Sequence, residues 1–198
     1  MPEGVRVDIL APSELWATAI EEMPKVVTTT VIAAVKATNR VHRSYEVCVV
    51  LSDNRELGIL NKEYRGIDQP TNVLSFPGEP LDDDEGSYAI GERPMVLGDI
   101  VIAYETMARE ASEAQKPLAD HLTHILIHGV LHLCRFDHED EKDAEQMEAL
   151  EIAVLRELGV ADPYAFPPAP RRGAKRKTKK KQTAAPRKSA PKAARRKL

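Results

Sequence analysis

Cysteines and long apolar runs are scarce in this sequence, and both scarcities exclude a class of protein. The 198 residues include only two cysteines, Cys48 and Cys134, which lie in apolar stretches. We therefore expect reduced, buried thiols rather than a disulfide framework. No stretch approaches the roughly 18 consecutive apolar residues of a membrane-spanning helix, and the start, MPEGVRVDIL, lacks the features of a secretory signal peptide. These absences predict a cytoplasmic protein with no membrane partner.

Acidic residues are absent from residues 171–198, which also lack Ile, Val, Phe and Tyr. This stretch carries 14 of the 28 Lys and Arg residues, so residues 1–170 have a net charge of −17. Such a composition cannot bury a core and predicts disorder. A basic run usually binds polyanions such as RNA by counterion release, with a purely solubilising role as the alternative. Prolines in DPYAFPPAP mark the boundary between a domain at residues 1–165 and a Pro-, Lys- and Arg-rich disordered tail at residues 166–198.

The spacing of apolar residues predicts about four strands and about five helices. We expect strands at residues 5–10, 45–51, 72–76 and 95–103. We expect helices at residues 13–39 (in two pieces broken near Pro24), 53–65, 104–116, 118–134 and 140–158. An acidic loop is expected at residues 79–92, and the acidic residues from Glu139 to Glu151 are interpreted as a solvated helix face. Because the helices are concentrated late in the chain, the fold class is α+β: a single domain with a small mixed sheet packed against helices.

Three histidines lie within eleven residues, in the run HGVLHLCRFDH: His128, His132 and His138. His128 and His132 are four residues apart in an apolar helical stretch, so they share one helix face and can hold one metal ion, as in the H-x-x-x-H half of zinc hydrolases. His138 can join them only if the helix ends and the chain turns back. Three histidines with an open fourth position are typical of catalytic zinc. We expect one Zn²⁺ per chain and no small-molecule cofactor.

His124 and Cys134 are two further candidates for a metal ligand. His124, His128 and His132 also form a stripe, but its outer members are roughly 12 Å apart along the helix axis. One ion with Zn–N bonds of about 2 Å cannot reach both. We interpret His124 as a core histidine bonded to a backbone carbonyl, with a position along a substrate cleft as the alternative. Cys134 is expected on the opposite helix face from His132.

The histidine run resembles H-G-x-L-H-L-x-G-Y-D-H, the signature of the YbeY family of endoribonucleases and rRNA maturation factors. Two other segments resemble the same family: LNKEYRGIDQPTNVLSFP at residues 60–77 and LGDIVI at residues 97–102. The resemblance extends over most of residues 5–165. It implies a functional arginine at Arg65, because phosphoryl transfer needs positive charge in the transition state and arginine grips phosphate with two parallel hydrogen bonds.

The sequence departs from the family pattern at three positions. Arg135 stands where the family has Gly, Phe136 where it has Tyr, and Asn72 where it has Asp. An arginine in a left-handed turn costs about 1 kcal/mol more than glycine, and we expect the turn to tolerate that strain. Asn72 keeps the size of Asp without its charge, so we interpret this position as hydrogen-bonding.

The resemblance implies a single-strand-specific, metal-dependent endoribonuclease. It further implies rRNA maturation, including 16S 3′-end processing, ribosome quality control, and rRNA and the ribosome or its small subunit as partners. The alternative is a ribosome assembly factor with a mainly structural zinc and negligible turnover. A zinc peptidase is disfavoured, because Gly129 stands where H-E-x-x-H enzymes carry their glutamate base.

Overall fold

A computed structural model describes residues 4–39, 44–78, 94–138 and 140–165. The acidic loop predicted at residues 79–92 and the tail predicted at residues 166–198 lie outside the described residues. None of the helices in the described ranges has the length and apolar character needed to cross a membrane.

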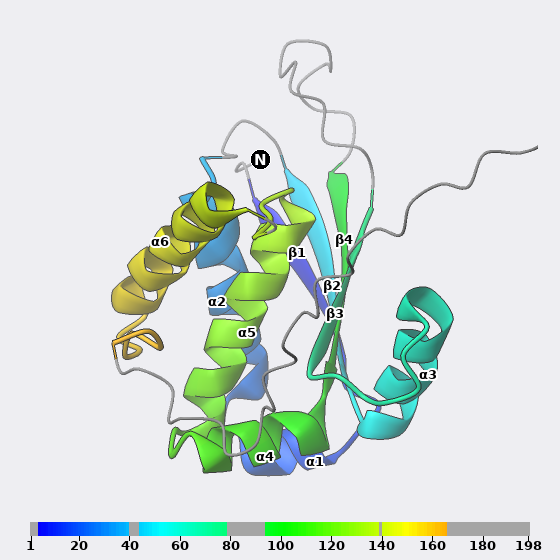
Figure 1. Cartoon of the computed structure of the whole chain (residues 1–198). Coiled ribbons are helices and arrows are strands. Elements are labelled where there is room, and N and C mark those ends of the chain that lie inside the picture. Colours follow the sequence, from blue (N-terminus) through cyan, green and yellow to red (C-terminus); the bar gives the residue numbers. More distant parts are fainter. Residues whose placement is uncertain (1–3, 40–43, 79–93, 139, 166–198) are drawn as a thin grey trace, which may run out of the picture. The chain divides into compact units, whose positions relative to one another are not determined.

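The described residues form one mixed sheet and six helices (Figure 1). The strands are β1 (Val5–Leu10), β2 (Tyr45–Ser52), β3 (Val73–Pro77) and β4 (Met95–Ala103). The helices are α1 (Leu15–Ala19), α2 (Met23–Ala37), α3 (Asn54–Arg65), α4 (Tyr104–Glu113), α5 (Leu118–Leu133) and α6 (Glu141–Glu157). The sheet order is β1-β2-β4-β3, with β1, β2 and β4 parallel and β3 antiparallel to β4. The predicted α+β class with a small mixed sheet is confirmed.

The two faces of the sheet are covered by different helices. Alternate side chains of β2, such as Val47 and Val49, are fully buried in the main core, which α2 and α5 share. The opposite face carries a smaller cluster that contains Val101 and Leu57, the latter from α3. Figure 1 shows α2, α5 and α6 on one side of the sheet and α3 on the other. This period-two alternation is what a sheet covered on both faces requires.

The helix break predicted near Pro24 lies slightly earlier in the chain. Residues 20–22 separate α1 from α2, and Glu22 has a φ of 53°. Pro24 lies in the first turn of α2, where the missing N–H would have no helical partner in any case. The proline therefore begins a helix rather than dividing one.

The ends of α3 follow their predicted capping residues. The Asp53 carboxylate accepts a hydrogen bond of 2.9 Å from the backbone N–H of Glu56, as an N-cap does. Gly66 follows the helix with a φ of 71°, the left-handed conformation that glycine adopts at little cost. The two caps make Arg65 the last residue of α3.

Candidate metal centre

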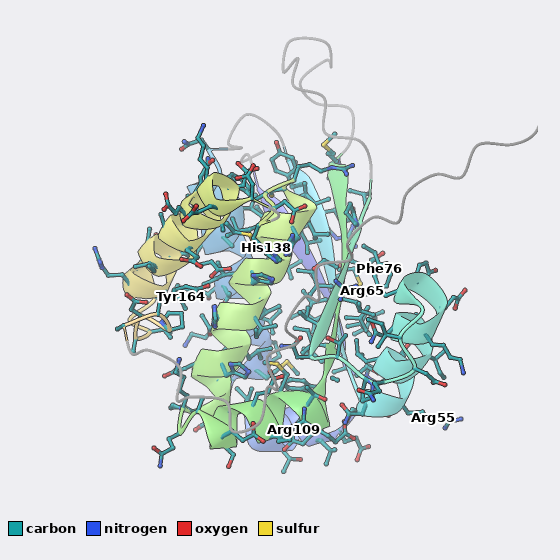
Figure 2. The ribbon with its side chains drawn as sticks, viewed as in Figure 1. Arg55, Arg65, Phe76, Arg109, His138 and Tyr164 are labelled. Atoms are coloured by element: carbon teal, nitrogen blue, oxygen red, sulfur yellow. The ribbon has the colours of Figure 1, made fainter. Side chains whose placement is uncertain are left out.

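The three predicted histidines come together at the C-terminal end of α5. One ring nitrogen from each of His128, His132 and His138 can be chosen so that all three lie within 4.8 Å of one another. The Nε2 atoms of His128 and His132 are 3.1 Å apart, and their rings are nearly perpendicular. Figure 2 shows His138 beside this end of the helix. The group could hold a metal ion.

Hydrogen bonds at the Nδ1 atoms of His128 and His132 leave the two Nε2 atoms to hold a cation. Nδ1 of His128 is 2.8 Å from a carboxylate oxygen of Glu151, and Nδ1 of His132 is 3.1 Å from the backbone carbonyl oxygen of Phe136. Both partners are acceptors, so each Nδ1 carries the proton, and each Nε2 of a neutral ring presents a lone pair. Two lone pairs facing each other at 3.1 Å repel unless a proton or a metal ion lies between them. The donor set therefore fits a metal ion.

The electrostatics of His132 favour the neutral imidazole that metal binding needs. Burial lowers the pKa of His132 below its ordinary value of 6.5, and the neighbouring His128 and His138 lower it further. Asp137 and the Phe136 carbonyl act in the opposite direction but do not reverse the shift.

A tight turn after α5 brings His138 back to the helical pair. The N–H of Arg135 donates to the His132 carbonyl over 3.0 Å, and the N–H of Phe136 donates to the Leu131 carbonyl over 3.0 Å. Arg135 has a φ of 69°, so the position keeps the left-handed conformation although the family's glycine is missing. The expectation that the turn tolerates this strain is confirmed.

Close packing against the sheet explains the glycine between the two helical ligands. A Cβ atom at Gly129 would lie 3.1 Å from Ser75 Oγ and 3.2 Å from two side-chain carbons of Ile100. The Ser75 hydroxyl donates to the Gly129 carbonyl over 3.3 Å. A glutamate at this position would point into the sheet, so α5 has no room for the general base of an H-E-x-x-H peptidase.

Glu151 is the residue of this site that the sequence interpretation missed. We expected a solvated residue on the acidic face of α6, but Glu151 is 1% exposed. The signal was present, because position 151 lies four residues after Met147 and three before Val154, both of which are buried. At helical spacing, these two apolar residues place Glu151 on the core-facing side.

Three donors surround the Glu151 carboxylate. Besides His128 Nδ1, it faces Nε2 of His124 at 3.4 Å and the hydroxyl of Tyr164, which donates to Oε2. Burial alone would raise the pKa of Glu151, but the hydrogen bonds from His124, His128 and Tyr164 outweigh it and hold the pKa at about 2. The expectation that His124 bonds a backbone carbonyl is therefore wrong: its partner is a carboxylate from the neighbouring helix.

Arg65 comes from a different part of the fold than the three histidines. It is exposed at the end of α3, and Figure 2 shows it near Phe76, on the α3 side of β3. The Tyr64 ring packs edge-on against the Phe76 ring, with centroids 4.9 Å apart, and this contact anchors the end of α3 on β3. Among the described residues, no hydrogen bond or ion pair joins Arg65 to the histidine group. No described residue forms a hydrogen bond or an ion pair with its guanidinium.

A second polar network surrounds Asn72, just before β3. Asn72 Nδ2 donates to Glu110 Oε2 over 3.0 Å, and His121 Nε2 is 3.1 Å from the same oxygen. Burial raises the pKa of Glu110, but hydrogen bonds from His121 and Asn72 reverse the shift and lower it. The interpretation of Asn72 as hydrogen-bonding is confirmed. An aspartate could not donate to Glu110 at neutral pH, so the amide suits this carboxylate.

Comparison with known proteins shows where this chain belongs. Three relatives are named Endoribonuclease YbeY. The one from Bradyrhizobium diazoefficiens is 45% identical over 84% of this chain and 89% of its own. The one from Parvibaculum lavamentivorans is 43% identical over 81% and 85%, and the one from Magnetococcus marinus is 52% identical over 60% and 82%. The sequence profile of the family described as Endoribonuclease YbeY matches residues 14–159, which include all three histidines and Arg65. The chain thus belongs to the Endoribonuclease YbeY family.

Proposed function

We propose that this protein is a zinc-dependent endoribonuclease that hydrolyses phosphodiester bonds in single-stranded RNA. The observation that carries the proposal is the convergence of His128, His132 and His138, with Nε2 lone pairs facing each other, in a chain that belongs to an endoribonuclease family. The names of the relatives support the reaction class.

Zinc is the metal that best suits these donors. Neutral imidazoles are preferred zinc ligands, and three of them leave a fourth position for water or substrate. The chemistry that zinc supplies at such a site is activation of water near neutral pH and Lewis acidity toward a phosphoryl oxygen. The protein's part is to hold the imidazoles neutral and fixed. The buried Glu151 and the Phe136 carbonyl act on His128 and His132 in that sense.

Arg65 is proposed to bind the phosphate group as negative charge grows in the transition state. Its exposure at the end of α3, with no described protein partner, supports this role. The basic tail at residues 166–198 is proposed to raise the affinity for RNA without entering the chemistry.

The biological substrate is proposed to be rRNA, bound to the ribosome or its small subunit. On this proposal the protein trims rRNA precursors, including the 3′ end of 16S rRNA, and takes part in ribosome quality control. The two free cysteines are consistent with a cytoplasmic protein.

The decisive experiment combines elemental analysis with single-turnover RNA cleavage by repurified, zinc-loaded protein. We expect one zinc per chain and cleavage by the wild type, and neither in His132→Ala. The matched control is His121→Asn, which changes a histidine about three turns before His132 on α5 that lies outside the group. Zinc binding without cleavage, under single-turnover conditions, would favour the alternative of an assembly factor with a structural metal. Absence of zinc binding would contradict the proposed site.

A further inference from the structure

The two oxygen atoms of the Glu151 carboxylate face different partners. Its Oε1 atom faces His128 Nδ1 at 2.8 Å. Its Oε2 atom faces His124 Nε2 at 3.4 Å and accepts the hydrogen bond of the Tyr164 hydroxyl. The side chain is 1% exposed, although most of its acidic neighbours on α6 are in solvent. Helix packing alone would be served better by an apolar residue, because a buried charge is unfavourable unless every oxygen has a donor.

The hydrogen bond to Oε1 controls two properties of His128. It keeps the proton on Nδ1, and it limits rotation of the ring, so that Nε2 faces Nε2 of His132 at 3.1 Å. A carboxylate on the far nitrogen of a ligand histidine also increases the basicity of the near one. The His128 side chain is only partly buried, so packing in the core does not by itself fix the orientation of the imidazole ring.

The hydroxyl of Tyr164 in turn limits the orientation of the Glu151 carboxylate. Tyr164 comes from the segment that follows α6, and its ring also packs edge-on against His124 with centroids 6.0 Å apart. With Oε2 facing Tyr164 and His124, Oε1 is the oxygen that faces His128 Nδ1. Figure 2 shows Tyr164 beside α6, on the same side of the molecule as α5.

We propose that Glu151 is the positioning residue of the metal ligand His128, and that Tyr164 holds Glu151 in the orientation that this requires. The inference rests on the metal site proposed above, but not on RNA cleavage. It assigns a role to the segment after α6, which lies outside the histidine motif.

The first test measures the affinity of the full-length, metal-free protein for Co²⁺ by competition with a chromophoric chelator. We expect Glu151→Gln to weaken binding about 10- to 100-fold, the usual effect of losing such a partner. Tyr164→Phe should weaken binding less, by a few-fold. Glu145→Gln, at an exposed position of the same helix, and Tyr64→Phe on α3 are the matched controls and should bind like the wild type. Glu151→Asp keeps the charge but is one methylene too short to reach Nδ1, so it should resemble Glu151→Gln.

The second test needs no variant of Glu151 and therefore does not depend on its folding. Nitrogen NMR of ¹⁵N-histidine-labelled wild type should show His128 as the Nδ1–H tautomer in the metal-free protein. It should also show a slowly exchanging Nδ1 proton that exchanges faster in Tyr164→Phe. A purely packing role for Glu151 would change the melting temperature but would not select this tautomer.

The outcomes separate this inference from the proposed function. If the wild type binds no Co²⁺ or Zn²⁺, the proposed metal site is wrong. If the wild type binds metal and folded Glu151→Gln binds it equally well, only the positioning role is overturned. An Nε2–H tautomer at His128 in the wild type would overturn it as well.

Discussion

The Ser75 hydroxyl, on β3, donates to the carbonyl oxygen of Gly129 over 3.3 Å, directly beside the ligand His128. This contact is possible because residue 129 has no side chain, so α5 can approach β3 and β4 closely. The same approach that fixes the helix on the sheet removes the space for a carboxylate between the two helical histidines.

Gly129→Ala should therefore destabilise the fold, although alanine is the better helix former. The new Cβ would be 3.1 to 3.2 Å from Ser75 and Ile100, and overpacking costs about 1–3 kcal/mol against a gain of up to about 1 kcal/mol in helix propensity. Urea unfolding should show a net loss of about 1 kcal/mol. The control is Gly58→Ala in α3, where the nearest atom would be 3.8 Å away, and there we expect a gain. A gain at both positions would mean that the packing at Gly129 is not tight.

Arg135→Gly should stabilise the protein by about 0.5–1 kcal/mol, because a left-handed conformation strains arginine and not glycine. The extra freedom of glycine in the unfolded chain offsets part of the gain. Thermal unfolding of the metal-free protein measures the change. The comparison is Arg156→Gly inside α6, which should lose stability, and a loss at both positions would show that Arg135 makes a stabilising contact.

Glu110→Gln should lower stability at pH 7 and should have progressively less effect as the pH falls. The pKa of Glu110 is lowered in the folded protein from 4.5, so its ionised form favours folding. That contribution is complete above about pH 4.5 and is lost as the pH falls through the lower folded pKa. Urea unfolding between pH 3 and pH 7 tests the trend, with exposed Glu113→Gln of the same helix as control. A pH-independent difference would contradict a charged role for Glu110.

Arg65→Ala should lose most RNA cleavage, at least tenfold and of the order of 10²-fold if it contacts the transition state, and should keep its metal and melting temperature. Arg65→Lys should recover only part, because lysine lacks the planar fork that pairs with phosphate. Arg55→Ala, at an exposed arginine of the same helix, is the matched control for lost surface charge. Equal activity in the Arg65 and Arg55 alanine variants would refute the specific role.

Truncation after Pro170 should weaken RNA binding at low salt and flatten its salt dependence, because fewer counterions are released. The truncated protein should keep its metal content and its cleavage rate at saturating RNA. An unchanged salt slope would indicate a solubilising tail, and lost cleavage at saturation would place the tail in the active site.

The histidine group could be predicted from the sequence because helix geometry fixes it. Two residues four apart on a helix must share a face, so the spacing of His128 and His132 determines their proximity. His138 was chosen as the third ligand because helix geometry places His124 too far from His132 and because the run resembles the family signature. The strands and helices followed in the same way from local apolar spacing.

The residues that hold the histidines in place could not be predicted from local spacing, because their contacts depend on how separate helices pack. Nothing local to Glu151 distinguishes it from its exposed neighbours Glu145 and Glu148 except two flanking apolar positions. Its partners His124, His128 and Tyr164 lie on another helix and on a later segment. The partnership of Glu110 with Asn72 and His121 is hidden for the same reason, since three separate segments supply it.

The position of Tyr164 has a consequence for the order in which the protein is made. A ribosome synthesises the sheet, α5 and all three histidines before the residue whose hydroxyl bonds Glu151 has been added. A chain released early, for example from a broken message that ends before codon 164, would carry the histidines without the full support around them. The support of the proposed metal site would thus be complete only after the segment that follows α6 has been synthesised.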